Sequence, residues 1–310
     1  MLYKVSVIRR IKHASTATCT LPIYMGFLMT EPNSISCTQL AETYNISHDS
    51  VNRFLEREDY TPHDLYQEAI QHIDNNKLIV SIDDTVLDKP YSQHMDLVSY
   101  FWSGKHHRSV KGINLITLYA TDQNGQNIPI NFRIYDKSEG KTKNDYFMDM
   151  LSEVLSWGAK IQFITGDSWY SSTGNLKTIR KYGIRFMFGI DCNRKVSPEK
   201  GQWFQLRLLP NFHQGQVVWL KDFGFVQLFK TQLKEQQRFY IVHQDEDDLL
   251  SFEGFHELHS SHWKIEQYHR VIKQVCHIEK FQVRRSKLIL NHIFAALMAY
   301  VEIQKNQFER

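Results

Sequence analysis

The sequence has little cysteine. Only four cysteines occur in 310 residues, and no two of them have the close spacing of a zinc knuckle: Cys19, Cys37, Cys192 and Cys276. Four scattered thiols in a chain of this size indicate a reducing cytosol. We therefore expect a cytoplasmic protein.

Long apolar runs, internal repeats, low-complexity linkers and a strong net charge are also missing. No apolar stretch stands out as approaching the roughly 20 residues that span a bilayer, so no membrane association is expected. Lys and Arg number 37 against 34 Asp and Glu, which gives a formal net charge of +3. A nucleic-acid partner would therefore have to be held by local basic patches rather than by overall charge.

Residues 1–75 are predicted to be helical and to form a first region. Within them, "TQLAETYNISHDSVNRFLERED" places apolar residues where a helix-turn-helix buries them, with "NIS" as the turn. A second helix carrying Arg53 could then lie in a major groove of DNA. A small helical bundle without DNA-binding activity is the alternative.

From Lys77 onward the pattern changes to strands. "KLIVSIDD", "GINLITLYAT" and "NIPINFRIYD" read as strands, and Asn124-Gly125 between the last two predicts a hairpin. Alternating helices and strands follow to about residue 193. This order predicts an α/β fold, a mixed sheet with helices packed on it. The catalytic core would comprise residues 76–193 and 251–310, with a β-rich insertion at 194–250 and two long helices at the end.

Carboxylates stand where two of these apolar strands are predicted to end. Asp83 and Asp84 follow the run "LIVSI", and Asp167 follows "KIQFITG". If the two strands are neighbours, Asp84 and Asp167 would meet at one edge of the sheet, where open α/β sheets place their ligands. The alternative is that each aspartate is an ordinary turn residue.

The first of the two long helices carries a third acid. Its polar face combines Glu266 with histidines and basic residues: His259, His262, His269, Arg270 and Lys273. A solvated face of an amphipathic helix is the alternative explanation. Three carboxylates on rigid elements suit two Mg²⁺ ions, which take oxygen ligands and leave positions open for water and phosphate.

In this combination the sequence resembles the insertion-sequence DDE transposases. The resemblance rests on "IDDT", "GDSWYSS", "HWKIEQYHRVIKQ" and the trailing "EKFQVRRSKLILNHIFAALMAY", in this order. It implies an RNase H-like fold with a β-rich insertion before the last catalytic helix. It also implies two Mg²⁺ ions per active site, with Mn²⁺ as a substitute.

The resemblance assigns the three acids to Asp84, Asp167 and Glu266, because the family's first acid directly precedes Thr. Asp83 would be a neighbour of the metal site, and a swap of roles between the two aspartates stays open. In this branch of the family a Tyr and an Arg precede the Glu, and a Lys follows it.

Lys273 fits the Lys position of that helical pattern, but His259 and His262 replace the Tyr and the Arg. A neutral imidazole is a weaker phosphate partner than a guanidinium, whereas a protonated one would serve. Together with Arg270, Arg284 and Arg285, these residues are the predicted DNA contacts of the core. Ordinary solvated loops explain such charge runs as well.

The implied function is transposition. The protein would cut the ends of its mobile element and join the 3′-OH to target DNA. Its partners would be the terminal repeats and the target, bound by a dimer assembled on DNA. The alternatives are an RNase H-like nuclease without strand transfer, and a degenerate copy that binds DNA without cutting it.

Overall fold

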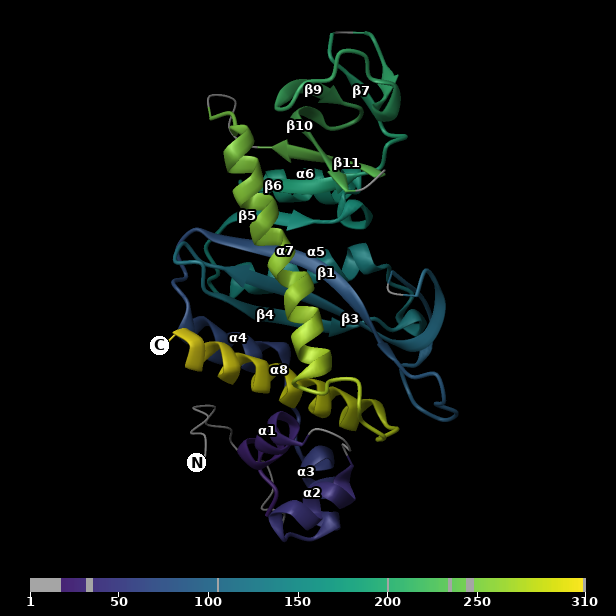
Figure 1. The fold of residues 1–310 in the computed structure, drawn as a ribbon, viewed down its shortest axis with the longest axis vertical. Coiled ribbons are helices and arrows are strands. Elements are labelled where there is room, and N and C mark those ends of the chain that lie inside the picture. Colours follow the sequence, from purple (N-terminus) through teal and green to yellow (C-terminus); the bar gives the residue numbers. More distant parts are fainter. Residues whose placement is uncertain are drawn as a thin grey trace.

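The computed structural model describes residues 18–31, 36–104, 106–199, 201–233, 236–243 and 248–308. Residues 1–17 of the predicted N-terminal region therefore lie outside the described residues, as do short parts of the predicted insertion. Within the described ranges the chain forms a helical N-terminal part and a large mixed sheet with helices on both faces (Figure 1).

The N-terminal part contains helices and no strand within its described residues. Its elements are α1 (Leu21–Thr30), α2 (Cys37–Tyr44), α3 (His48–Arg57), α4 (Pro62–Ala69) and the 3-10 turn η1 (Ile70–His72). Asn45 ends α2 in the left-handed conformation, with φ of 52°, so that α3 starts three residues later in a new direction. The helices thus follow the order of the predicted helix-turn-helix, although Tyr44, one of the residues at the apolar positions of that pattern, is 37% exposed.

Five strands form the centre of the sheet: β1 (Leu78–Asp88), β3 (Arg108–Thr121), β4 (Asn127–Ile134), β5 (Ile161–Gly166) and β6 (Arg185–Ile190). They lie in the order β4-β3-β1-β5-β6. The first three are antiparallel, and β1, β5 and β6 are parallel. The predicted hairpin joins β3 to β4, with Gly125 in the left-handed region at φ of 80°. This order and these directions are those of an RNase H-like fold.

The remaining strands extend the sheet. The edge strand β2 (Ser99–Ser103), which was not predicted, pairs with the start of β3. The insertion contributes β7 (Lys195–Ser197), β8 (Phe204–Gln205), β9 (Gln216–Leu220), β10 (Gly224–Leu233) and β11 (Gln236–His243). Because β11 pairs with β6, the insertion continues the core sheet instead of standing apart from it.

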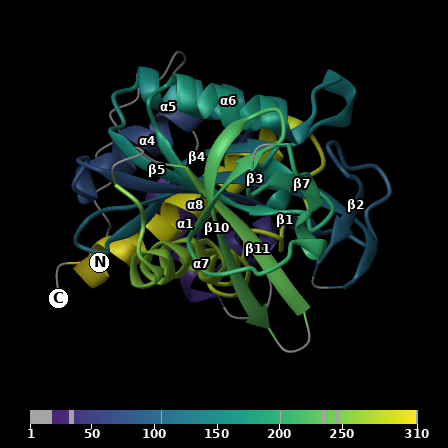
Figure 2. The same cartoon turned by 90° about the horizontal axis from the view of Figure 1, so that it is seen from above.

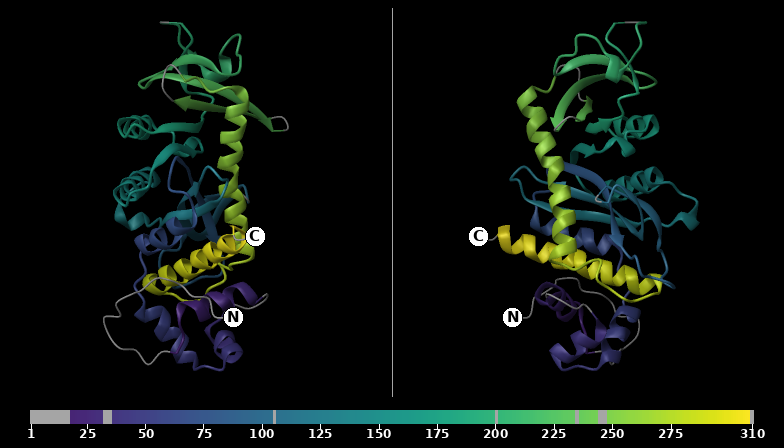
Figure 3. Two further views of the ribbon diagram at one scale, coloured as in Figure 1. Left: turned by 90° about the vertical axis from the view of Figure 1, so that its left-hand side faces the viewer. Right: turned by 45° about the vertical axis from the view of Figure 1, so that its right-hand side comes forward.

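Helices cover both faces of the sheet. Helices α5 (Lys143–Ser156) and α6 (Thr173–Lys181) lie on one face, and α7 (Phe252–Gln274) lies on the other (Figures 2 and 3). Short 3-10 turns complete the described chain: η2 (Lys137–Glu139), η3 (Ser168–Tyr170) and η4 (Leu206–Leu208). In Figure 1, α7 runs from the insertion strands across the sheet to α8 (Ser286–Phe308).

Helix α8 corrects the expectation that no apolar stretch is long enough to span a bilayer. With 23 residues it passes that test by length and composition alone. However, 72% of its most apolar window is buried, and it packs against α1, α3, α4 and β4. Its apolar surface is therefore explained by its place in the core.

We expect the core histidine His292 of α8 to make the protein sensitive to acid. It is fully buried, with Nδ1 2.8 Å from the Tyr24 hydroxyl oxygen. Burial, aided by the charge of Lys89, lowers the pKa of His292 to about 3. Its contribution to stability is complete above the unfolded pKa of about 6.5, and about 1.4 kcal/mol is lost per pH unit below it.

Urea unfolding between pH 7.5 and 4.5 measures this effect. His292→Gln should reduce the slope of the free energy of unfolding against pH by about 1.4 kcal/mol per pH unit, the contribution of one proton. An unchanged slope would contradict the assignment.

Candidate active site

The carboxylates of β1 and β5 meet where β5 leaves the sheet. Pairing between the two parallel strands ends with Ile82 opposite Gly166, and the next residues are Asp83 and Asp167. The strand β1 itself continues to Asp88 against β3, so the two adjacent aspartates lie inside a strand and not at its end. The edge needed for the site is therefore created by the end of β5 alone.

Glycine is required at the end of β5. A Cβ atom on Gly166 would lie 2.6 Å from Phe188 Cε1 and 2.7 Å from Ile82 Cγ2. Such distances are clashes, since real Cβ atoms stay beyond 3.0 Å from such neighbours. The absence of a side chain at Gly166 thus lets β1, β5 and β6 approach closely beside the carboxylates.

Asp83 faces helix α7. Ligand atoms of Asp83, Glu266 and His269 all lie within 4.8 Å of one another, and Asp83 Oδ2 is 3.6 Å from His269 Nδ1. Burial raises the pKa of Asp83 well above its ordinary value, and the negative charge of Asp167 raises it further. Asp84 and Glu266 act in the same direction. Several acids thus share one small volume, an arrangement that a cation would stabilise.

Asp167 stands beside this group. Its side chain is exposed and accepts a hydrogen bond from the Trp169 backbone N–H at 2.9 Å. Desolvation by the surrounding protein, followed by the negative charge of Asp84, raises the pKa of Asp167 to about 6. Asp167 directly follows the end of β5, which is the place that the sequence predicted for it.

Asp84 was expected to be a metal ligand, but in the structure both of its carboxylate oxygens accept hydrogen bonds from other side chains. Its Oδ2 accepts hydrogen bonds from Asn114 Nδ2 at 2.6 Å and from Lys143 Nζ at 2.7 Å. Its Oδ1 accepts one from the Tyr170 hydroxyl at 2.8 Å. Successive side chains on a strand point to opposite faces, so Asp83 faces α7 whereas Asp84 faces α5 and η3. The structure therefore favours the swapped roles, with Asp83 beside Glu266.

Comparison with known proteins bears on this arrangement. The family model for the transposase DDE domain matches residues 74–301. The chain belongs to the transposase DDE domain family. That match agrees with the resemblance seen in the sequence.

Two further comparisons add little about this DDE transposase. No curated protein is similar enough to count as a match. Among solved structures, an Argonaute from Marinitoga piezophila, crystallised with 5′ OH guide RNA and target DNA, is 10% identical. The likeness covers 78% of this chain and 32% of the Argonaute chain, with a TM-score of 0.25. So low a score carries no argument about fold or function.

Two histidines of α7 that were predicted to contact phosphate form hydrogen bonds within the protein. His262 Nδ1 lies 3.1 Å from the Thr165 hydroxyl oxygen, and burial lowers the pKa of His262 to about 4. His259 Nε2 lies 3.0 Å from the Tyr240 hydroxyl oxygen, and burial lowers its pKa as well. The surroundings of both imidazoles thus favour the neutral form, which is the weaker phosphate partner.

The predicted basic residues lie in several places. Lys273 is mostly buried and donates a hydrogen bond to the Val86 carbonyl oxygen at 2.7 Å, which joins α7 to β1. Arg270 is exposed one helical turn after Glu266, and Arg53 is exposed on α3. Arg284 and Arg285 are exposed just before α8, where Arg285 pairs with Glu56 at 2.8 Å. Only Lys273 and Arg270 are therefore close to Glu266 along the same helix.

Sequence reasoning missed the residues that hold Asp84. Lys143, at the start of α5, comes 59 positions after Asp84, and no pattern connects the two. Tyr170 stands in the quoted "GDSWYSS", where its complete burial was not foreseeable. The position of His269 on the polar face of α7 was recognised, but not its contact with Asp83.

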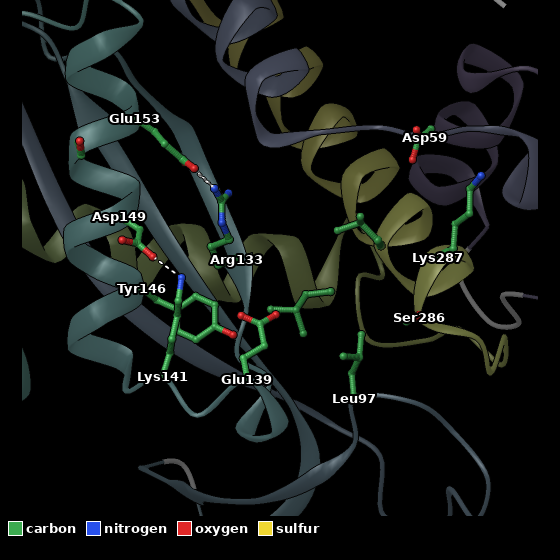
Figure 4. Close-up of a pocket in the computed structure, with 13 residues that line it drawn as sticks. Asp59, Leu97, Arg133, Glu139, Lys141, Tyr146, Asp149, Glu153, Ser286 and Lys287 are labelled. Atoms are coloured by element: carbon green, nitrogen blue, oxygen red, sulfur yellow. Dashed lines mark hydrogen bonds and ion pairs between the residues drawn. The ribbon is translucent and has the colours of Figure 1, made fainter. Parts of the chain in front are cut away.

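The structure also contains a groove of about 730 Å³ that does not include the acids of β1, β5 and α7 (Figure 4). It is lined by residues of β4, α5 and the start of α8, among others. Two ion pairs occupy its wall, Arg133 with Glu153 and Lys141 with Asp149. Lys287 is a further basic residue of the lining, but Asp59 and Glu139 add two acids, so the groove has no excess of positive charge for phosphate.

Proposed function

We propose that this DDE transposase cuts DNA at the ends of its mobile element and joins the freed 3′-OH to target DNA. The single observation that carries the proposal is the meeting of acids from β1, β5 and α7 at one edge of an RNase H-like sheet. The family match supports a transposase function in general. The cleavage and strand-transfer steps are our inference.

We infer that Asp83, Asp167 and Glu266 hold the metal. Carboxylate oxygens are the ligands that Mg²⁺ prefers, and Mn²⁺ accepts the same set. When bound, two such ions supply Lewis-acid activation of the attacking oxygen and neutralisation of phosphate charge. Burial and the neighbouring acids raise the pKa of Asp83, and a bound cation would lower it again.

The remaining side chains hold these acids in place. Asp84 joins β1 to α5 through Lys143 and to η3 through Tyr170, which follows Asp167 closely in sequence. Lys273 ties α7 to β1, and its ammonium group contributes positive charge beside the acids. We propose that this positive charge partly neutralises the phosphate next to the scissile bond.

We assign two successive reactions to this site. Water attacks a phosphodiester at the element end, which breaks the P–O bond and releases a 3′-OH. That hydroxyl then attacks a target phosphodiester, so that one P–O bond forms as another breaks. The second step needs no external energy source.

DNA recognition is proposed for the N-terminal region up to residue 75, with the core at 76–193 and 251–310 and the insertion at 194–250. Arg53 on the exposed side of α3 would contact the terminal repeats, and Arg270, Arg284 and Arg285 would contact phosphates. We further infer that the protein acts in the cytoplasm, as a dimer once two DNA ends are bound.

Incubation of the full chain with end-labelled DNA from the flanks of its coding sequence, in Mg²⁺, tests the proposal. We expect metal-dependent cuts at the element ends. A supplied plasmid should acquire the labelled 3′ ends in covalent products. Cutting without joined products would instead indicate a nuclease, and binding without cutting a degenerate copy.

A further inference from the structure

His269 is a buried imidazole with unusual surroundings. It is only 6% exposed, and Nε2 has no hydrogen-bond partner among the described residues. Its Nδ1 lies 3.6 Å from Asp83 Oδ2, which is longer than a hydrogen bond. Buried polar atoms without partners are rare in folded proteins, and ion binding is one of the established explanations for them.

The position of His269 connects it to the acids. It lies three residues after Glu266 on α7, so the two side chains project from neighbouring positions of one helix face. Ligand atoms of Asp83, Glu266 and His269 fit within 4.8 Å of one another. Helix α7 is held firmly at this point, because Ile265, Tyr268 and Ile272 are buried in the core. The imidazole is therefore presented rigidly to the carboxylates.

An ion pair with Asp83 explains the arrangement less well. The 3.6 Å between Asp83 Oδ2 and His269 Nδ1 is too long for the charge-assisted hydrogen bond of a buried ion pair, and such a pair would leave Nε2 without a partner. A neutral imidazole nitrogen is a good ligand for first-row transition metals, whereas Mg²⁺ favours oxygen.

We propose that His269 is a nitrogen ligand of the metal held by Asp83 and Glu266. The site then binds Mn²⁺ in preference to Mg²⁺, because one of its donors is an imidazole. The inference rests on the proposed function, since it concerns the same carboxylate site. It adds a ligand and a metal preference that three carboxylates alone do not imply.

Pulsed EPR of Mn²⁺ bound to the full chain tests the inference without any measurement of cleavage. A directly coordinated imidazole couples the ¹⁴N nucleus to the Mn²⁺ spin, and ¹⁵N-histidine labelling changes that coupling. We expect the coupling in the wild type and its loss in His269→Ala. It should persist in His256→Ala, a matched control on the exposed side of the same helix.

Equilibrium titrations give a second readout. His269→Ala should weaken Mn²⁺ binding by about tenfold or more, at least the loss seen when a partner of a ligand is removed. Mg²⁺ binding should change less, so the ratio of the two affinities should fall.

The outcomes separate the two proposals. Wild-type protein that binds Mn²⁺ without nitrogen coupling overturns the role of His269 and leaves the carboxylate site standing. Wild-type protein that binds no Mn²⁺ overturns both. Should His269→Ala fail to fold, the labelled wild-type spectrum still decides the question.

Discussion

Asp83→Asn is expected to reduce metal-dependent DNA cleavage about 1,000-fold or more. The substitution keeps the size of the side chain but removes the charge that faces Glu266 and His269. Loss of one charged metal ligand removes several kcal/mol of transition-state stabilisation, and about 4 kcal/mol corresponds to a factor of 1,000. Initial cleavage rates of the flanking-end substrate at saturating Mg²⁺ measure the loss.

Asp84→Asn is the matched comparison, because it makes the same chemical change at the neighbouring residue. An asparagine keeps one acceptor oxygen, so it can accept either the Tyr170 hydrogen bond or the Lys143 hydrogen bond but not both, and we expect a loss of about tenfold through weaker positioning. Glu266→Gln should resemble Asp83→Asn. If Asp84→Asn proves inactive while Asp83→Asn cuts normally, the first acid is Asp84, the residue directly before the Thr of "IDDT", and our assignment to Asp83 is wrong.

The second large effect concerns stability. Asn291 of α8 is fully buried, and its Nδ2 donates hydrogen bonds to the carbonyl oxygens of Leu55 and Glu58, each at 2.7 Å. Its Oδ1 accepts one from the Tyr60 N–H at 3.2 Å. Asn291→Ala removes all three, at about 1 kcal/mol each, and leaves a small cavity. We expect the free energy of unfolding to fall by about 3 kcal/mol or more.

Asn306→Ala provides the control for this experiment. Asn306 lies on the same helix and is exposed, and among the described residues its side chain bonds only to Glu302, so a change within about 0.5 kcal/mol is expected. Equal losses in the two variants, measured by urea unfolding, would show that Asn291 does not join α8 to the N-terminal helices. A selective loss would confirm that the proposed DNA-recognition region is fixed to the core.

Local patterns were sufficient to predict most of the elements. Asn124-Gly125 predicted the β3–β4 hairpin because the turn needs a left-handed residue, and Gly125 adopts that conformation. The segments that form α5 to α8 were predicted as helices because burial of one helix face places apolar residues at a regular spacing in the sequence. The edge strand β2 was missed, since it is five residues long and exposes Tyr100 and Trp102.

The sequence could not show whether Asp83 or Asp84 lies beside Glu266, and the reason is physical. Alternation along a strand reveals its faces only if one face is polar, whereas Val80, Ser81 and Ile82 are all buried because helices cover both faces. Which aspartate meets α7 depends on a helix that follows roughly 170 residues later. The same holds for the contact of Lys143 with Asp84.

Mn²⁺ binding to wild type, Asp83→Asn and Asp84→Asn, compared by calorimetric titration, tests the central claim most directly. Our account predicts that Asp83→Asn loses about tenfold or more in affinity, while Asp84→Asn stays close to wild type. A loss confined to Asp84→Asn, with Asp83→Asn binding normally, would contradict the site described above.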